Sequence, residues 1–202
     1  MGLYGLKPAS QRLVRPIEDL LVARGVSPDA ITGAAVVAAA AGGSCLALAG
    51  RAPALLLAIP VLAAARLVLN ILDGTVARRT GRSRPVGELW NELGDRVADV
   101  LFIGGLAFNP SVEPRLALAA VIAALLASYA GVVARAAGGR RQYGGIMSKP
   151  GRMIVLAVAA PAAYVTGDGR LLAAAPALIV VGSLATLAQR VATARVELDR
   201  AG

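Results

Sequence analysis

Long apolar blocks alternate with short charged clusters along most of this chain. Six blocks stand out, covering residues 30–50, 52–72, 87–108, 116–133, 153–166 and 171–188. A helix rises about 1.5 Å per residue, so about 20 residues cross a hydrocarbon layer of roughly 30 Å. The fifth block is shorter and contains Pro161. The pattern predicts an all-α polytopic membrane protein with six transmembrane helices.

The segment before the first block, SQRLVRPIEDLLVARG, is amphipathic. Leu13, Ile17, Leu20 and Leu21 recur at helical spacing, with charges on the opposite side. This predicts a helix lying in the membrane surface, although a soluble helix packed on a core has the same pattern. We therefore expect one domain over residues 1–202: a cytoplasmic or interfacial helix (1–28), a six-helix bundle (30–188) and a cytoplasmic tail (189–202).

The amino-acid composition excludes several kinds of site. The chain of 202 residues is 57% hydrophobic and 16% charged, with no His and one Cys, Cys45, inside the first block. These counts exclude a disulfide framework, a thiol zinc site and Ser-His or Cys-His catalysis within this chain.

The net charge of +9 comes from residues that cluster between the blocks. Most of the 21 Lys and Arg lie before the first block, between the second and third, between the fourth and fifth, and after the sixth. The other connections carry one Arg each: Arg51, Arg115 and Arg170. The positive-inside rule places both termini and the two rich loops in the cytoplasm. No module for reading bases is present in the pattern, so we expect no nucleic-acid partner.

Polar residues form a stripe on each of two predicted helices. The second helix carries a stripe at i, i+4, i+7 and i+11, made of Arg66, Asn70, Asp73 and Ala77. The third carries one at every fourth position, made of Gly87, Asn91, Asp95 and Asp99. A short basic loop joins the helices, so we expect the stripes to face each other at one membrane surface.

Two interpretations fit these stripes. Carboxylate and amide oxygens are the ligands of hard cations such as Mg²⁺, Mn²⁺ or Ca²⁺. The alternative is a buried lattice in which Asp95 or Asp99 pairs with Arg66, Arg78 or Arg96 to hold the helices together. Three small residues beside the carboxylates leave room for a bulky ligand, or else serve close helix packing: Gly74, Ala77 and Gly87. With Arg78 as a phosphate ligand, the set describes a diphosphate site.

These residues carry a resemblance to a known family. The chain reads Asn70-x2-Asp73-Gly74-x2-Ala77-Arg78-x8-Gly87-x3-Asn91-x3-Asp95. It resembles the pattern D-x2-D-G-x2-A-R-x8-G-x3-D-x3-D of the CDP-alcohol phosphatidyltransferases, with every spacing matched. The resemblance implies a membrane transferase of phospholipid biosynthesis, which moves a phosphatidyl-type group from a CDP-linked lipid to an alcohol and releases CMP. It also implies a homodimeric six-helix bundle in the bacterial inner membrane, with its site open to the cytoplasm.

The resemblance also assigns roles to the motif. It implies Mg²⁺ or Mn²⁺ held by four residues: Asn70, Asp73, Asn91 and Asp95. Asp95 would be the general base for the acceptor hydroxyl. The CDP moiety would lie against Gly74, Ala77, Arg78 and Gly87.

The chain departs from the pattern at two ligands. Asn70 and Asn91 stand where the family has Asp, so two carboxylates remain of four. Three explanations compete: a branch that carries Asn naturally, an engineered inactive protein, and a noncatalytic relative that binds CDP-lipid or acts as a scaffold. The surrounding residues resemble a bacterial branch with Asn at both positions and favour the first. Glu88 and Glu92 are candidates to restore charge, or are solvated residues at a helix start.

The basic loop at residues 135–152 lies on the same predicted side. In family members with a phosphorylated acceptor, such basic residues bind its phosphate. That implies an acceptor site for a phosphorylated polyol at Arg135, Arg140, Arg141, Lys149 and Arg152. A topology signal or contact with anionic lipid explains the same charges. A transporter is disfavoured because the polar residues stop at one surface.

Overall fold

Helices make up the regular structure of residues 7–200, which the computed structural model describes, with side-chain surroundings given from residue 14 onward. No strand occurs within that range, so the prediction of an all-α fold is confirmed. The chain order is α1 (Lys7–Ala23), α2 (Pro28–Leu48), η2 (Pro53–Ala58), α3 (Ile59–Arg79), α4 (Pro85–Gly104), η3 (Gly105–Phe108), α5 (Pro114–Ala136), α6 (Lys149–Thr166) and α7 (Gly169–Asp199).

Each predicted apolar block coincides with one helix from α2 to α7. The boundaries differ in three places. The second block begins in η2, the third ends in η3, and the predicted tail continues α7 as helix to Asp199. Within residues 7–200, four helices are long and apolar enough to cross a membrane: Pro28–Leu48, Pro53–Arg79, Pro114–Ala136 and Gly169–Asp199. The other two, α4 and α6, carry charged residues that line the cavity described below.

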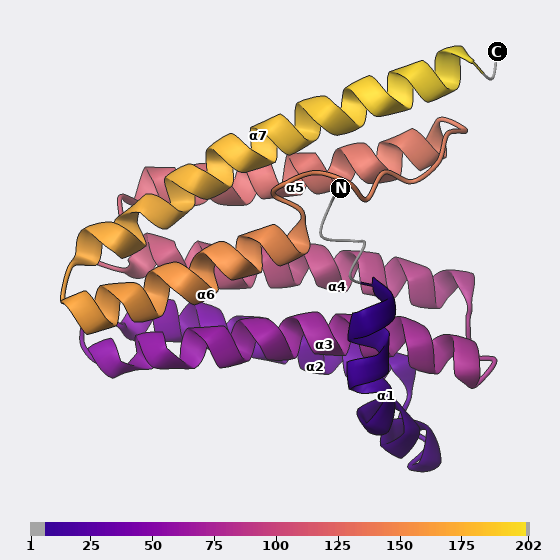
Figure 1. The fold of residues 1–202 in the computed structure, drawn as a ribbon, viewed down its shortest axis with the longest axis horizontal. Coiled ribbons are helices and arrows are strands. Elements are labelled where there is room, and N and C mark those ends of the chain that lie inside the picture. Colours follow the sequence, from indigo (N-terminus) through magenta and orange to yellow (C-terminus); the bar gives the residue numbers. More distant parts are fainter. Residues whose placement is uncertain (1–6, 201–202) are drawn as a thin grey trace.

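Helices α2 to α7 run side by side along the long axis (Figure 1). Helix α6 packs between α3 and α7, while α5 packs against α7, and α2 packs against both α3 and α4. The main neighbours of α3 are thus α2 and α6, whereas those of α4 are α2 and α5. Helices α3 and α4 therefore meet chiefly through long side chains, which leaves space between them.

Glycines bring α2 and α4 into close contact. A methyl group on Gly43 would lie 2.0 Å from the carbonyl oxygen of Leu101, and one on Gly105 would lie 2.1 Å from the carbonyl oxygen of Gly43. Small residues of this kind let helix backbones approach where no side chain fits. The contact fixes α4 against α2 and so sets the position of the polar stripe on α4.

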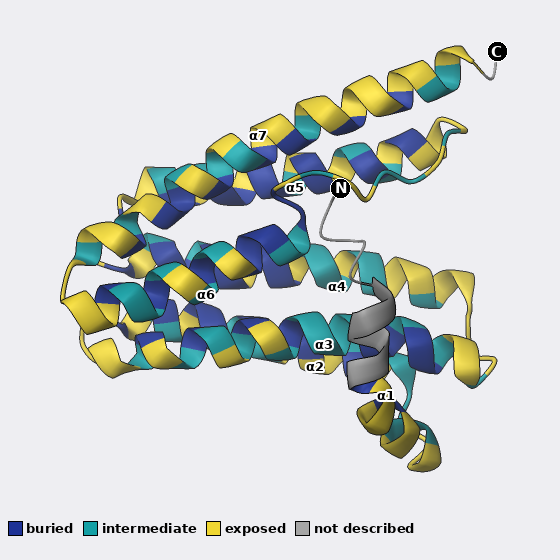
Figure 2. Cartoon of the chain, viewed as in Figure 1, coloured by how far each residue is buried: buried dark blue, intermediate teal, exposed yellow. Residues whose placement is uncertain are grey.

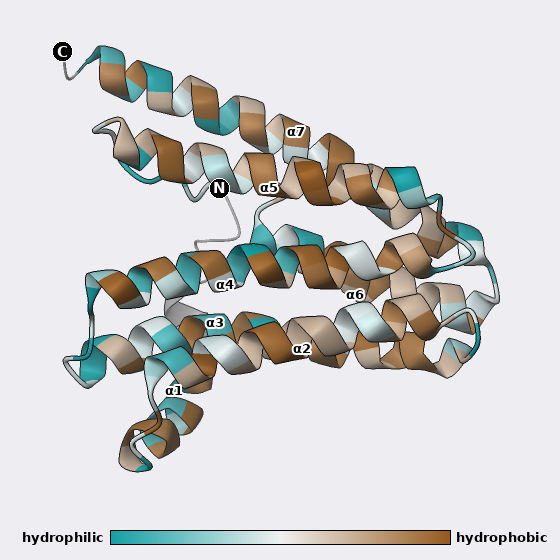
Figure 3. Cartoon of the chain, turned by 180° about the vertical axis from the view of Figure 1, so that it is seen from behind, coloured by the Kyte–Doolittle hydropathy of each residue, from teal (hydrophilic) through white to brown (hydrophobic). Residues whose placement is uncertain are grey.

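Apolar side chains also cover the outside of the bundle. Exposed Val, Leu and Ile side chains occur on all its long helices, and buried residues alternate with them (Figure 2). The middle of the bundle is largely hydrophobic in colour, while hydrophilic residues gather toward its ends and along the start of α4 (Figure 3). Such an apolar exterior is typical of helices that face lipid.

Helix α1 crosses the bundle at the end where α3 finishes (Figure 1). Val14 is buried in a cluster with Leu72 and Val76 of α3. Ile17 and Leu20 are exposed, so these two predicted apolar residues do not pack on the bundle. The side chain of Leu13 lies outside the described residues.

Candidate active site

A cavity of about 740 Å³ opens where α3 ends and α4 begins. The start of α2, the end of α5, the loop before α6, the start of α6 and Arg190 of α7 form its other walls. The sequence-predicted site residues that line it are Asn70, Asp73, Gly74, Ala77, Arg78, Gly87, Asn91, Asp95, Arg135, Arg141, Lys149 and Arg152. Arg140 does not line it; its side chain is 92% exposed and contacts Glu197 at 3.5 Å.

The two polar stripes lie opposite one another in antiparallel register. Arg66 Nη2 is 2.6 Å from Asp99 Oδ1, and one helical turn along, Asn70 Nδ2 donates to Asp95 Oδ1 at 2.8 Å. One further turn along each helix, Asp73 and Gly74 of α3 and Asn91 of α4 also line the cavity. Helical periodicity on both sides of a short loop thus brings oxygen donors from two helices into one cavity.

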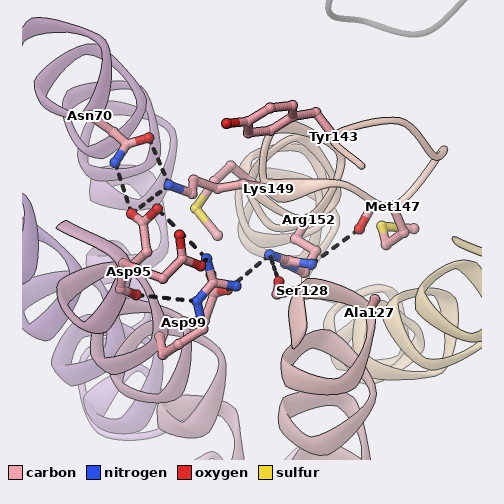
Figure 4. A network of polar contacts seen from close by, with 12 residues as sticks. Asn70, Asp95, Asp99, Ala127, Ser128, Tyr143, Met147, Lys149 and Arg152 are labelled. Atoms are coloured by element: carbon pink, nitrogen blue, oxygen red, sulfur yellow. Dashed lines mark hydrogen bonds and ion pairs between the residues drawn. The ribbon is translucent and has the colours of Figure 1, made fainter. Parts of the chain in front are cut away.

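Lys149 joins this pair from the start of α6. Its ammonium group donates to Asn70 Oδ1 at 2.6 Å and forms an ion pair with Asp95 Oδ1. Figure 4 shows the Lys149 side chain extended between the two residues. The three side chains form a closed polar cluster in which each touches the other two.

Asp73 is held separately, at the end of α3. Its side chain accepts hydrogen bonds from the Thr32 hydroxyl, at 3.1 Å, and from the backbone N–H of Gly74. Asp73 is 2% exposed, and within the described residues neither of its carboxylate oxygens forms an ion pair. Thr32 was not predicted as a site residue, because nothing in the sequence links the first turn of α2 to Asp73.

Asp99 forms the kind of buried ion-pair lattice that was the alternative to a metal site. It is fully buried between Arg66 and Arg152, and Arg152 Nη2 lies 2.8 Å from Asp99 Oδ2. Arg152 also donates to the carbonyl oxygen of Met147 at 3.1 Å and to the Ser128 hydroxyl at 3.5 Å (Figure 4). The network joins α3, α4, α5 and α6, and Arg96 links it to Asp95, because its guanidinium lies 4.0 Å from Asp99 Oδ2 and 3.7 Å from Asp95 Oδ2. The Asp73 carboxylate is not part of it.

Both glutamates predicted to restore charge are paired with arginine. Glu92 Oε1 lies 2.9 Å from Arg96 Nη2, and Glu92 Oε2 forms an ion pair with Arg141. Glu88 Oε2 lies 3.8 Å from Arg135. These contacts neutralise the two glutamates. Asp73 and Asp95 remain as carboxylate ligands for a cation, although Asp95 is itself paired with Lys149 and lies 3.7 Å from Arg96.

Cations line the opposite wall, where the loop before α6 passes. The Arg141 guanidinium lies 4.9 Å from the centre of the Tyr143 ring. Arg190 of α7 also lines the cavity and donates to the carbonyl oxygens of Ala127, Tyr143 and Gly144. Arg190 was missed by the sequence interpretation because it belongs to what looked like a tail.

Two cavity residues keep polar atoms available. Arg78 is exposed, and neither it nor Asn91 has a hydrogen bond or ion pair with another side chain in the described part of the chain. A methyl group on Gly74 would lie 3.3 Å from the Arg78 guanidinium, and one on Gly87 would meet nothing nearer than Asp29 at 4.0 Å. Gly74 therefore leaves open the space beside Arg78, and Gly87 leaves open the space beside Asp29.

The oxygen atoms in the cavity are of the chemical type that binds a hard divalent cation. Two carboxylates, Asp73 and Asp95, and the amides of Asn70 and Asn91 supply oxygen to one cavity. Among the described residues no group of three or more His, Cys, Asp or Glu gathers, so a metal here depends on the amides as well.

Comparison with known proteins identifies the family. The inner membrane protein YnbA of Escherichia coli is 32% identical over 155 residues, which are 77% of this chain and 77% of that protein. The phosphatidylinositol phosphate synthase of Corynebacterium glutamicum is 30% identical over 204 residues, covering 96% of this chain and 89% of the synthase. The chain belongs to the CDP-alcohol phosphatidyltransferase family.

Solved structures agree with this assignment. The phosphatidylinositol phosphate synthase of Mycobacterium tuberculosis with CDP-DAG bound superposes with a TM-score of 0.72 at 25% identity, over 91% of this chain and 94% of that chain. The same synthase has been crystallised with manganese and citrate, and that structure also superposes with a TM-score of 0.72. No protein-family model matches the chain. This CDP-alcohol phosphatidyltransferase thus shares its fold with a metal-binding member that takes a CDP-linked lipid.

Proposed function

We propose that this CDP-alcohol phosphatidyltransferase transfers a phosphatidyl group from a CDP-diacylglycerol-type donor to a phosphorylated polyol, releasing CMP, at the cytoplasmic face of a bacterial inner membrane. The observation that carries the proposal is a single cavity lined by Asp73, Asp95, the small residues Gly74 and Gly87, and several arginines: Arg78, Arg135, Arg141 and Arg190. A diphosphate needs cationic partners, and its nucleotide needs open space.

The donor diphosphate binds at the α3–α4 end of the cavity. Asn70, Asp73, Asn91 and Asp95 are the residues from which the ligands of Mg²⁺ or Mn²⁺ are drawn. When bound, the ion neutralises charge on the phosphates and on the leaving CMP. Arg78 holds the nucleotide end, and the backbone at Gly74, Ala77 and Gly87 lets the CDP moiety lie close to the helices.

The transfer is a direct displacement. The acceptor hydroxyl oxygen attacks the phosphorus that bears the lipid, the bond from that phosphorus to CMP breaks, and the hydroxyl proton passes to the Asp95 carboxylate. Asp95 suits the base role because it lines the cavity and is only partly exposed.

The acceptor phosphate binds near the end of α5 and the loop before α6, where Arg135, Arg141, Lys149 and Arg152 line the cavity. Arg135 and Arg141 are the more accessible pair, because Arg152 is buried against Asp99 and Lys149 is held by Asn70 and Asp95. The related synthases are named for phosphatidylinositol phosphate, so inositol phosphate heads the acceptors to test.

The membrane arrangement completes the proposal. All six helices α2 to α7 span the bilayer in one domain, with α4 and α6 shielded by the four apolar spans. Helix α1 lies in the cytoplasmic surface, where exposed Ile17 and Leu20 meet lipid. The positive-inside rule places both termini in the cytoplasm, and the protein acts as a homodimer.

The test is release of CMP by purified protein. We expect Mg²⁺- or Mn²⁺-dependent CMP release from CDP-diacylglycerol with inositol phosphate, compared across glycerol phosphate, serine and free inositol. The proposal is contradicted if none of these acceptors gives turnover in the unaltered protein while the double variant Asn70→Asp with Asn91→Asp is active. The protein would then be a noncatalytic binder of CDP-lipid.

A further inference from the structure

The contacts of Lys149 raise the question of how many metal ions the cavity holds. Lys149 Nζ lies 2.6 Å from Asn70 Oδ1 and also forms an ion pair with Asp95 Oδ1. Both oxygens belong to the predicted ligand set. An ammonium group placed on two ligand oxygens competes with a divalent ion for the same electron pairs.

We propose that Lys149 is a built-in cation of the site, which occupies the position between Asn70 and Asp95 and limits the chain to one divalent ion. The inference rests on the proposed function, because it concerns the same diphosphate site. Asp73, Asn91 and Asp95 Oδ2 are the donors left for that ion, and Asp95 Oδ2 lies 3.7 Å from Arg96 Nη2.

The amide at position 70 fits this role where a carboxylate does not. Asn70 Nδ2 donates to Asp95 Oδ1 at 2.8 Å, while Asn70 Oδ1 accepts from Lys149. An aspartate at this position has no N–H to donate and would bring two carboxylates into contact, which repel unless a second cation lies between them. Asn70 and Lys149 therefore depend on each other.

The charges of the residues around the cavity also favour a single divalent ion. Four carboxylates, those of Asp73, Asp95, Asp99 and Glu92, lie among five paired cations, so this cluster has one net positive charge before any metal ion binds: Arg66, Arg96, Arg141, Lys149 and Arg152. One divalent ion gives a site with net positive charge suited to a diphosphate. Two would place a large excess of positive charge in a buried space, at a steep electrostatic cost.

The burial of Lys149 shows that the ammonium is held in place. Its side chain is 13% exposed and that of Asp95 is 15% exposed. Lys149 follows Ser148, the N-cap of α6, so its backbone is fixed by the helix start. The Lys149 ammonium is therefore a fixed part of the cavity, unlike the ammonium of a flexible lysine on the protein surface.

Manganese binding tests the inference directly. The full-length protein in detergent is titrated with Mn²⁺ and followed by electron paramagnetic resonance, which counts bound ions and detects exchange coupling between neighbours. We expect one uncoupled Mn²⁺ per chain in the unaltered protein. We expect two coupled ions in the double variant Asn70→Asp with Lys149→Met, in which the amide becomes a carboxylate and the ammonium is removed.

Arg84→Met is the matched control. Arg84 lines the same cavity, but its guanidinium contacts Asp29 at 3.1 Å and no predicted ligand. Its removal should leave one uncoupled ion. Two coupled ions in the unaltered protein, no bound ion there, or only one in the double variant would overturn the inference, and the unaltered protein alone decides if the double variant does not fold.

The same preparation separates this inference from the proposed function. One bound Mn²⁺ without CMP release on any acceptor would overturn the function and leave the single-ion site standing. CMP release by a protein that binds two coupled ions would support the proposed function and overturn the single-ion site.

Discussion

Arg66 on α3 and Asp99 on α4 form a fully buried ion pair, with Arg66 Nη2 2.6 Å from Asp99 Oδ1. Arg152 from α6 binds the other oxygen of the same carboxylate. One aspartate thus pairs with two guanidinium groups from two other helices, and the triad keeps one net positive charge. The triad fixes the separation of α3 and α4 just beyond the cavity, so it determines where Asn70 and Asp95 meet.

Asp99→Ala should strongly destabilise the protein. The change leaves Arg66 and Arg152 buried without a counter-charge, and breaking such a pair costs about 3–5 kcal/mol. The free energy of unfolding in mixed detergent micelles measures the effect. Asp199→Ala, which removes an exposed pair with Arg195, is the control and should leave stability within error. Equal stability of the two variants would show that the triad does not hold the helices.

Asp95→Asn should abolish most turnover while the fold is kept. The amide preserves the shape of the side chain but cannot take the acceptor proton, and loss of general-base catalysis costs about 10²–10⁴-fold in rate. CMP release under saturating donor and acceptor measures the change. Thermal unfolding of the variant serves as the control for folding. A rate equal to that of the unaltered protein would remove Asp95 from the mechanism.

Gly87→Leu should weaken donor binding. A methyl group at this position meets nothing nearer than 4.0 Å, so a side chain can start there without a clash, and a leucine fills space proposed for the CDP moiety. We expect the KM for the CDP-linked donor to rise about tenfold, equivalent to about 1.4 kcal/mol.

Gly33→Leu is the matched control for that change. Gly33 is exposed on α2, a methyl group on it would meet no atom within 4 Å, and it does not line the cavity. The KM for the donor should not move in this variant. A similar rise in both variants would point to a general effect of leucine on the helices.

Arg141→Met and Arg140→Met should differ although the residues are neighbours. Arg141 lines the cavity and Arg140 does not. Removing a charge-assisted contact to phosphate costs about 1.5–3 kcal/mol, so the KM of a phosphorylated acceptor should rise by about one to two orders of magnitude in Arg141→Met alone. Steady-state kinetics with inositol phosphate at low salt measures it. An equal effect of both changes would indicate a general surface potential.

The sequence by itself determined the helices and predicted that the two polar stripes meet. Apolar blocks of spanning length predicted α2 to α7, and the helical spacing of the stripes predicted that they face each other on antiparallel helices. Both results follow from local periodicity, since helical spacing and a short loop leave little freedom. The motif spacing was enough to indicate the family.

Only the tertiary structure decided which of these polar groups bind each other. Lys149 lies 79 residues from Asn70 along the chain, and Thr32 lies 41 from Asp73. The loop before α6 brings Lys149 into the cavity and leaves Arg140 outside, while α6 buries Arg152 against Asp99. Contacts between distant segments depend on how helices pack and how a long loop crosses them, and neither leaves a periodic signal in the sequence.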